Sequence, residues 1–213
     1  MGMPVPLYVQ RKFHAFLLYI IFKGKDYLLK ITTIMKTIRL LTFSSLDGYP
    51  VYPAPDNIMY LRNFNLKSHL LQGEGPLIIS GEDYAEIFQR NAGWPVTEIQ
   101  TYVISSSDMN VTPEAPVIFI TENPVRTLHK LKHENSSGCI FVITSGIGTG
   151  IISFLLKNKL LDEIHLITLP IVLGSESKAS GLFDNVPYSK WKLSSSTAHP
   201  SGVLETFYRR IQS

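Results

Sequence analysis

Ser145-Gly146-Ile147-Gly148-Thr149-Gly150 is the stretch of this sequence that says most about its fold. It follows the apolar run from Cys139 to Ile143, which is typical of a buried strand, and overlaps the start of a helical pattern from Thr149 to Asn158. A strand, a glycine-rich turn and a helix start aim backbone N–H groups and the positive end of the helix dipole at one point, which suits a phosphate. The alternative is that the glycines only permit a tight turn. As a nucleotide-cofactor cradle, the segment would use Ser145, Gly146, Gly148, Thr149 and Gly150.

The composition indicates one globular domain with a sizeable core, because the chain has 213 residues, 45% of them hydrophobic and 17% charged. The net charge of +3 does not come as a basic run interleaved with aromatic residues, so no nucleic-acid partner is expected. The single cysteine, Cys139, lies in an apolar run, and we expect a buried, inert thiol and a reducing, cytoplasmic setting. No set of Cys and His residues has complete metal-ligand spacing, so no metal site is expected.

Residues 1–34 differ from the rest of the chain. Phe13 to Phe22 is apolar and flanked by basic residues, but it is about half the length of a membrane-spanning helix. It also lacks the small-residue cleavage site of a secretory signal. We therefore expect residues 1–34 to be a disordered extension or a mis-assigned start, with the folded domain over residues 35–213 and Met35 as a hypothetical initiator. Membrane association through this segment is the alternative to a protein with no membrane contact.

From Lys36 onward, short β-rich runs alternate with helical patterns. Strands are expected at residues 38–43, 76–80, 101–105, 117–121, 139–144, 163–168, 191–197 and 203–209, and helices at 58–71, 83–90, 123–132 and 149–158. Asp83 is expected to open the second helix as an acidic cap, and Asn123 to cap the third. This order predicts an α/β fold with a mostly parallel central sheet, helices on both faces and an antiparallel C-terminal edge hairpin.

Ligands of such a sheet bind at the carboxyl ends of the strands, near the topological switch point. The segments that follow the predicted strands are polar or glycine-rich, as a cofactor with phosphates and ribose requires. These segments are residues 44–49, 81–83, 105–107, 121–123 and 144–150.

Two motifs connect the chain to a known family. Ser45-Leu46-Asp47-Gly48-Tyr49 follows the first strand, and Leu160-Leu161-Asp162-Glu163-Ile164 is followed by Leu169-Pro170-Ile171-Val172-Leu173-Gly174. In this order, over about residues 36–210, the chain resembles the reductase domain of the bacterial bifunctional riboflavin-biosynthesis deaminase/reductase and its stand-alone relatives. These proteins are members of the dihydrofolate reductase-like superfamily. The resemblance implies a homodimeric, NADPH-dependent oxidoreductase that passes hydride to a pyrimidine- or pterin-like heterocycle. The best-known activity of the family is 5-amino-6-(5-phosphoribosylamino)uracil reductase.

The resemblance also assigns roles to residues. It places the nicotinamide beside the loop that follows the first strand, and the cofactor phosphates on the Gly146–Gly150 turn. Asp47 is then the candidate catalytic residue, orienting the acceptor or relaying a proton, although a loop carboxylate that caps backbone N–H groups is the alternative. Ser105 and Ser106 are candidates for contact with the adenosine ribose or its phosphate. The remaining cofactor candidates are Ser45 and Gly81, and the substrate candidates are Asp47, Asp56 and Glu163.

Some of these candidates have structural interpretations, and the chain departs from the family pattern at two places. Asp56 follows a proline-rich stretch and is also a candidate helix cap, and Glu163 is a candidate for pairing with backbone amides or a cation. Gly81-Glu82-Asp83-Tyr84 stands where relatives carry Gly-Arg-x-Thr, and an acidic pair there repels phosphate unless the side chains point away. Thr144-Ser145-Gly146 replaces Glu-Gly-Gly. A non-catalytic member that binds a nucleotide or a protein is the second hypothesis.

Overall fold

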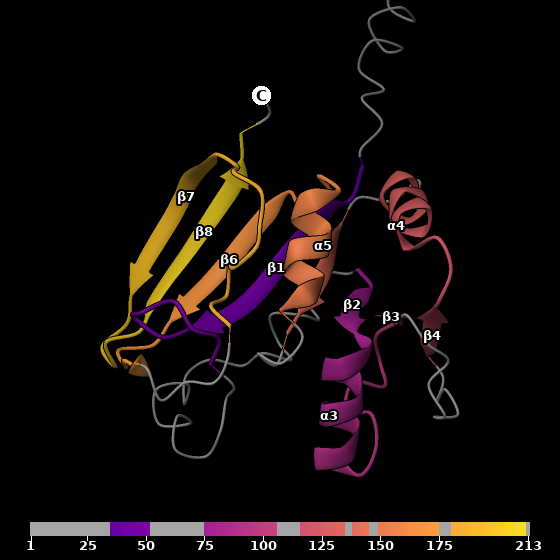
Figure 1. Cartoon of the computed structure of the whole chain (residues 1–213), viewed down its shortest axis with the longest axis horizontal. Coiled ribbons are helices and arrows are strands. Elements are labelled where there is room, and N and C mark those ends of the chain that lie inside the picture. The colour runs from indigo at the N-terminus through magenta and orange to yellow at the C-terminus, as the bar shows by residue number, and fades with distance from the viewer. Residues whose placement is uncertain are drawn as a thin grey trace, which may run out of the picture. The chain divides into compact units, whose positions relative to one another are not determined.

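Within the described part of the chain, eight strands form one sheet in the spatial order β4-β3-β2-β5-β1-β6-β8-β7 (Figure 1). This computed structural model describes residues 35–51, 75–105, 116–134, 138–144, 149–174 and 180–211, all within the compact unit Met35–Ser213. The strands are β1 (Thr37–Ser44), β2 (Leu77–Ser80), β3 (Thr101–Ile104), β4 (Val117–Ile120), β5 (Cys139–Ile143), β6 (Glu163–Thr168), β7 (Trp191–Ala198) and β8 (Leu204–Arg210). The helices are α3 (Gly81–Asn91), α4 (Pro124–His133) and α5 (Gly150–Lys157).

The sheet confirms the predicted architecture. The first six strands in the chain, β1 through β6, all run parallel to one another. β8 runs antiparallel to β6, and β7 runs antiparallel to β8 at the edge of the sheet. Every residue of β2 and β5 is buried, as expected for central parallel strands covered on both faces. The strand boundaries differ from those predicted by at most one residue at either end.

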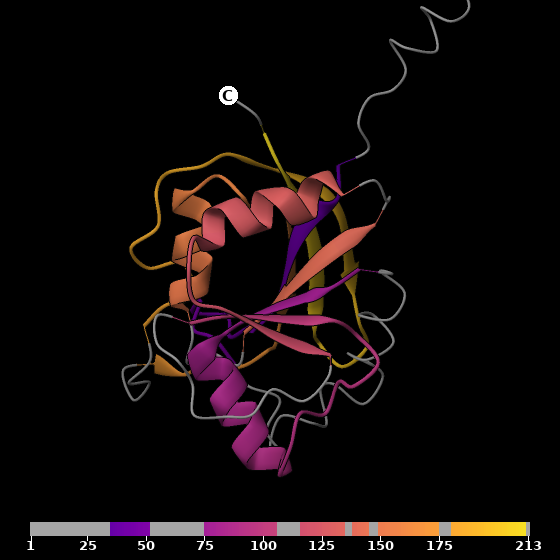
Figure 2. The same ribbon diagram turned by 90° about the vertical axis from the view of Figure 1, so that its right-hand side faces the viewer.

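Helices cover both faces of the sheet, and each face has its own apolar cluster. Leu41 and Phe43 of β1 pack in the cluster that includes Tyr84 of α3. Ile38 and Leu40 of the same strand point the other way, into the cluster that holds the apolar residues of α4 and α5. Figure 2 shows α4 and α5 close together, with α3 apart from them. The alternation along β1 therefore divides the core into two layers.

The chain reverses its winding between β2 and β5, which are neighbours in the sheet. β2 leads into α3 on one face, whereas β5 is followed by α5 on the opposite face. This is the topological switch point, where an α/β sheet opens a crevice beyond the carboxyl ends of its strands. The first turns of α3 and α5 flank that position.

Two helix starts differ from the prediction. α3 begins at Gly81 with Ser80 as its N-cap, so Asp83 is wrong as the cap. The Asp83 amide donates to Ser80 Oγ at 3.1 Å and Ser80 Oγ donates to the Asp83 carboxylate at 2.9 Å, so Asp83 is the third helical residue of a reciprocal cap. Asn123 is the N-cap residue of α4 as predicted, but its backbone is left-handed (φ 46°) and its side chain makes no cap hydrogen bond. The helix predicted at 58–71 lies outside the described residues.

Candidate active site

The loop after β1 is a tight turn centred on Asp47. The Gly48 amide donates to the Ser45 carbonyl at 3.1 Å, and the Tyr49 amide donates to Ser45 Oγ at 3.0 Å. Gly48 has φ +84°, a conformation that favours glycine over residues with a Cβ. Ser45 is buried, so its hydroxyl organises the turn, whereas Asp47 at the tip is exposed.

This turn is bound to the loop that follows β6. The Leu46 amide donates to the Ile171 carbonyl at 2.8 Å. The two carboxylate oxygens of Asp47 accept from the backbone amides of Leu173 at 3.2 Å and Gly174 at 2.7 Å. The Ser45–Tyr49 motif and the Leu169–Gly174 part of the second motif thus meet beyond the ends of adjacent strands. Both motifs are visible in the sequence, but no sequence signal points to the backbone amides that hold Asp47.

These contacts keep the Asp47 carboxylate ionised. The Ser45 hydroxyl and the amides of Gly174 and Leu173 lower the pKa of Asp47 from 3.8 to about 2, although desolvation acts in the opposite direction. A carboxylate with so low a pKa is a weak base and holds no proton at neutral pH. At this position it can fix loop geometry and attract or orient a polar group, but it is poorly suited to passing on a proton.

The helix starts at the switch point carry the other cofactor candidates. Gly81 and Asp83 of α3 are buried, and the Asp83 carboxylate is 0% exposed, so Glu82 is the acidic side chain that α3 presents to solvent in its first turn. At α5, Thr149 precedes the first helical residue, Gly150. A Cβ built on Gly150 meets nothing within 4 Å, so there is open space beside this residue in the first turn of α5.

The remaining candidates at the carboxyl edge are only partly described. Ser105 follows β3, and its amide donates to the Ile120 carbonyl at 3.2 Å, which ties the ends of β3 and β4 together. The loop of Asp47 and the starts of α3 and α5 follow the carboxyl ends of parallel strands, so they lie along the same edge of the sheet. The candidates outside the described residues are Asp56, Ser106, Ser145, Gly146 and Gly148.

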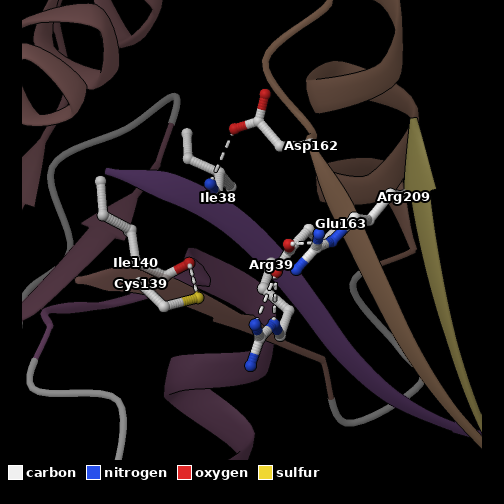
Figure 3. Close-up of polar contacts among 7 residues, drawn as sticks. All are labelled: Ile38, Arg39, Cys139, Ile140, Asp162, Glu163 and Arg209. Carbon is white, nitrogen blue, oxygen red and sulfur yellow. Dashed lines mark hydrogen bonds and ion pairs between the residues drawn. The ribbon is translucent and has the colours of Figure 1, made fainter. Parts of the chain in front are cut away.

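Glu163 lies at the opposite, amino-terminal edge of the sheet. Its carboxylate accepts from Arg39 of β1 at 2.6 Å and from Arg209 of β8 at 3.1 Å (Figure 3). This confirms the predicted pairing with a cation. The length of β6, about 16 Å at strand spacing, separates Glu163 from the carboxyl edge, so its contacts give no support to the predicted role in substrate binding.

Asp162, the neighbour of Glu163 in the motif, joins three elements. Its carboxylate accepts from the Ile38 amide at 2.8 Å and from Lys132 Nζ at 2.6 Å (Figure 3 shows the first contact). Its own amide donates to the Ile38 carbonyl at 3.0 Å, and its carbonyl accepts from the Arg210 amide at 2.9 Å. Through these contacts the Asp-Glu pair connects the start of β6 to β1, β8 and α4. The motif therefore has a structural role in this fold.

Cys139 has the inert environment that the sequence predicted. It is buried, and its thiol points toward the Ile140 carbonyl at 3.8 Å (Figure 3). Burial raises the pKa of the thiol from 9.0 to about 11, so the reactive thiolate is scarce at neutral pH. No group of three or more His, Cys, Asp or Glu side chains among the described residues could hold a metal ion.

Comparison with known proteins points to one family. A family model described as the RibD C-terminal domain matches residues 36–204. No curated protein matches the chain. Solved structures with a similar fold include a protein assigned to riboflavin biosynthesis from Shewanella sp. PV-4, with TM-score 0.63 and 19% identity over 83% of this chain and 99% of that one.

Two further structures show the same fold at low sequence identity. A pyrimidine reductase-like protein from Corynebacterium diphtheriae has TM-score 0.56 and 14% identity, over 86% of this chain and 96% of its own. Dihydrofolate reductase from Enterococcus faecalis, complexed with NADP(H), has TM-score 0.53 and 12% identity. The match covers 83% of this chain and 97% of the reductase. At these identities the similarity establishes the dihydrofolate reductase-like fold.

Proposed function

Because this chain belongs to the RibD C-terminal domain family and is a reductase with the dihydrofolate reductase-like fold, we propose that it transfers hydride from NADPH to a pyrimidine- or pterin-like heterocycle. The observation that carries the proposal is the joining of the Asp47 loop to the loop after β6, beside the strands that flank the switch point. Both family motifs thereby contribute to the edge where an α/β sheet binds its ligand.

We place the cofactor across the switch point between β2 and β5. Helix N-termini attract phosphate through their free amides and dipoles, and the open space at Gly150 gives a phosphate room to approach α5. Asp83 is buried and bound to Ser80, so Glu82 is the acidic side chain that α3 presents in its first turn. One exposed carboxylate repels a phosphate less than the acidic pair that the sequence suggested. The residues proposed to bind NADPH are Ser45, Gly81, Ser105, Ser106, Ser145, Gly146, Gly148, Thr149 and Gly150.

The bound cofactor would supply the hydride, and the protein would position the acceptor against the nicotinamide. Asp47 is ionised and fixed by two amides, so we assign it to orienting a polar N–H group of the heterocycle. Its low pKa favours this role over the proton relay, since a weak base transfers protons poorly. Solvent then supplies the proton. Asp56 remains a proposed substrate contact, and the position of Glu163 favours a structural role.

The narrower proposals concern substrate, assembly and location. Within this family we propose 5-amino-6-(5-phosphoribosylamino)uracil as the first substrate to test, although Thr144 stands where relatives carry a glutamate.

We also propose a cytoplasmic homodimer that uses the edge formed by β7, whose residues from Lys192 to Ala198 are all exposed. None of the helices in the described ranges has the length and apolar character needed to cross a membrane.

Titration with NADPH, followed by tryptophan fluorescence, tests the cofactor proposal. Quenching at micromolar NADPH is expected, and no quenching at millimolar NADPH would favour the non-catalytic alternative suggested by Glu82. Turnover is then measured as loss of NADPH absorbance with the uracil substrate. Asp47→Asn should lower kcat at least tenfold with little change in NADPH affinity. Asp184→Asn is the matched control, because Asp184 also sits on an exposed turn and accepts from a backbone amide, that of Gly181 at 2.8 Å.

A further inference from the structure

A pocket of about 730 Å³ lies at the amino-terminal edge of the sheet, opposite the proposed cofactor site. It is formed where β1 and β6 begin and where β8 ends; the start of β1 and the C-terminal end of β8 lie at the top of Figure 1. Its volume is in the range of pockets that hold small molecules. The lining residues are Met35, Lys36, Thr37, Lys132, Lys159, Asp162, Glu163, Arg209, Arg210 and Ile211.

Positive charge dominates this pocket. Five lining residues are basic and two are acidic, and both carboxylates are already occupied. Asp162 holds Lys132 and the Ile38 amide, and Glu163 is shared by two arginines. Within the described part of the chain, no carboxylate forms an ion pair with Lys159 or Arg210. The pocket therefore contains cations whose charge the described carboxylates do not neutralise.

The backbone at Lys159 is a second, independent observation. α5 ends with the Lys159 amide donating to the Leu156 carbonyl at 3.2 Å and the Leu160 amide donating to the Leu155 carbonyl at 2.9 Å. In this Schellman arrangement the residue at the position of Lys159 adopts a left-handed conformation, here with φ +56°, and glycine is strongly favoured there. A lysine at this position is locally unfavourable, and Lys159 is one of the residues that line the pocket. Strain of this kind is a reason to look for a function of the side chain.

We propose that this pocket binds a small multivalent anion of the phosphate or pyrophosphate class, with Lys159 and Arg210 as its principal contacts. Ammonium and guanidinium groups in a concave site bind phosphate through charge-assisted hydrogen bonds. A small ligand fits better than a nucleic acid, because the basic residues line one pocket and do not form an extended basic surface along the protein. The site is separate from the proposed cofactor site, since the strands between them run the full depth of the sheet.

Calorimetric titration of the full chain with inorganic pyrophosphate tests this site. The variant Lys159→Gly/Arg210→Gln should bind pyrophosphate at least tenfold more weakly than the parent protein. The matched control Lys157→Gln/Lys192→Gln removes two exposed basic side chains that lie outside the pocket and should bind like the parent. Saturating NADPH should leave pyrophosphate binding unchanged, because NADPH would occupy the opposite edge.

Lys159→Gly alone gives a readout that a purely structural role would not reproduce. It should raise the urea midpoint, since glycine relieves the left-handed strain, and still weaken pyrophosphate binding severalfold. The proposal is overturned by absence of binding, by equal binding in parent and pocket variant, by equal loss in the control, or by displacement with NADPH. A failed NADPH titration with intact pyrophosphate binding would overturn the proposed function and leave this site standing.

Discussion

Asp162→Asn is the substitution whose effect follows most directly from the structure. The asparagine side chain keeps an oxygen for the Ile38 amide, now bound at 2.8 Å, but removes the negative charge 2.6 Å from Lys132 Nζ. The Lys132 side chain is only 11% exposed, so water cannot fully replace the lost partner. Among the residues that the structure describes, the other hydrogen-bond acceptor of this ammonium is the Leu160 carbonyl, at 3.5 Å. The variant therefore leaves a mostly buried cation without its counter-charge.

The expected magnitudes come from the type of each contact. Breaking a buried ion pair by removing one partner costs about 3–5 kcal/mol, and a hydrogen bond to a charged group contributes about 1.5–3 kcal/mol. Because Asp162 is partly exposed and the amide contact survives, we expect Asp162→Asn to lower the free energy of unfolding by about 2–3 kcal/mol. Lys132→Met should cost about 1–2 kcal/mol, since the carboxylate keeps the Ile38 amide. The double variant should be less destabilised than the sum by about 1–3 kcal/mol.

Urea denaturation of the four proteins, followed by tryptophan fluorescence, measures this coupling. The control cycle is Glu86→Gln with Arg90→Met, an i,i+4 pair on α3 in which the Arg90 side chain is 51% exposed and that of Glu86 14%, and its coupling should stay below about 0.5 kcal/mol. The denaturant slope should be unchanged in every variant, so that midpoints report stability. If the Asp162 and Lys132 effects simply add, the ion pair contributes no stability and our account of the Asp-Glu motif is wrong.

Three other predictions concern single positions. The pKa of Asp47 is lowered from 3.8 to about 2, so its hydrogen bonds to the loop after β6 should be fully formed above pH 3.8 and be lost as the pH falls toward 2. Amide exchange in that loop should accelerate over this pH range. Asp47→Asn should abolish the pH dependence. Cys139 should react with a thiol reagent at least a hundredfold more slowly in the native protein than in urea, and rapid native labelling at pH 8 would contradict its burial. Gly75→Ala should destabilise the fold by more than about 2 kcal/mol, because a Cβ there would overlap the Cys139 carbonyl, whereas Gly150→Ala should cost less than about 0.5 kcal/mol; equal urea midpoints would refute this.

Local sequence patterns were sufficient to predict the sheet. The apolar runs of β1 and β5 and the turn residues between elements predicted the strands closely, since central parallel strands are buried on both sides and read as continuous hydrophobic segments. The start of α3 was misplaced because Ser80 and Asp83 cap it together, and the acidic residue was taken for the cap.

The partners of the site residues could not be predicted from local patterns. The Asp47 carboxylate binds the amide of Gly174, 127 positions away, and nothing in either segment alone specifies that contact. The same holds for Glu163, whose arginines come from β1 and β8. Glu163 is the first residue of β6, and the first residue of a parallel strand lies at the amino-terminal edge of the sheet. The predicted start of this strand would therefore have excluded Glu163 from a site at the carboxyl edge.

An aspartate stands at each end of the adjacent strands β1 and β6, and each one binds backbone amides across the pair. Asp162, just before β6, binds the backbone of β1, and Asp47, just after β1, binds the backbone beyond β6. A slip of one residue would move the strands by about 3.3 Å, break both sets of contacts and turn buried side chains toward the wrong face. Misaligned pairings are therefore penalised at two separate points.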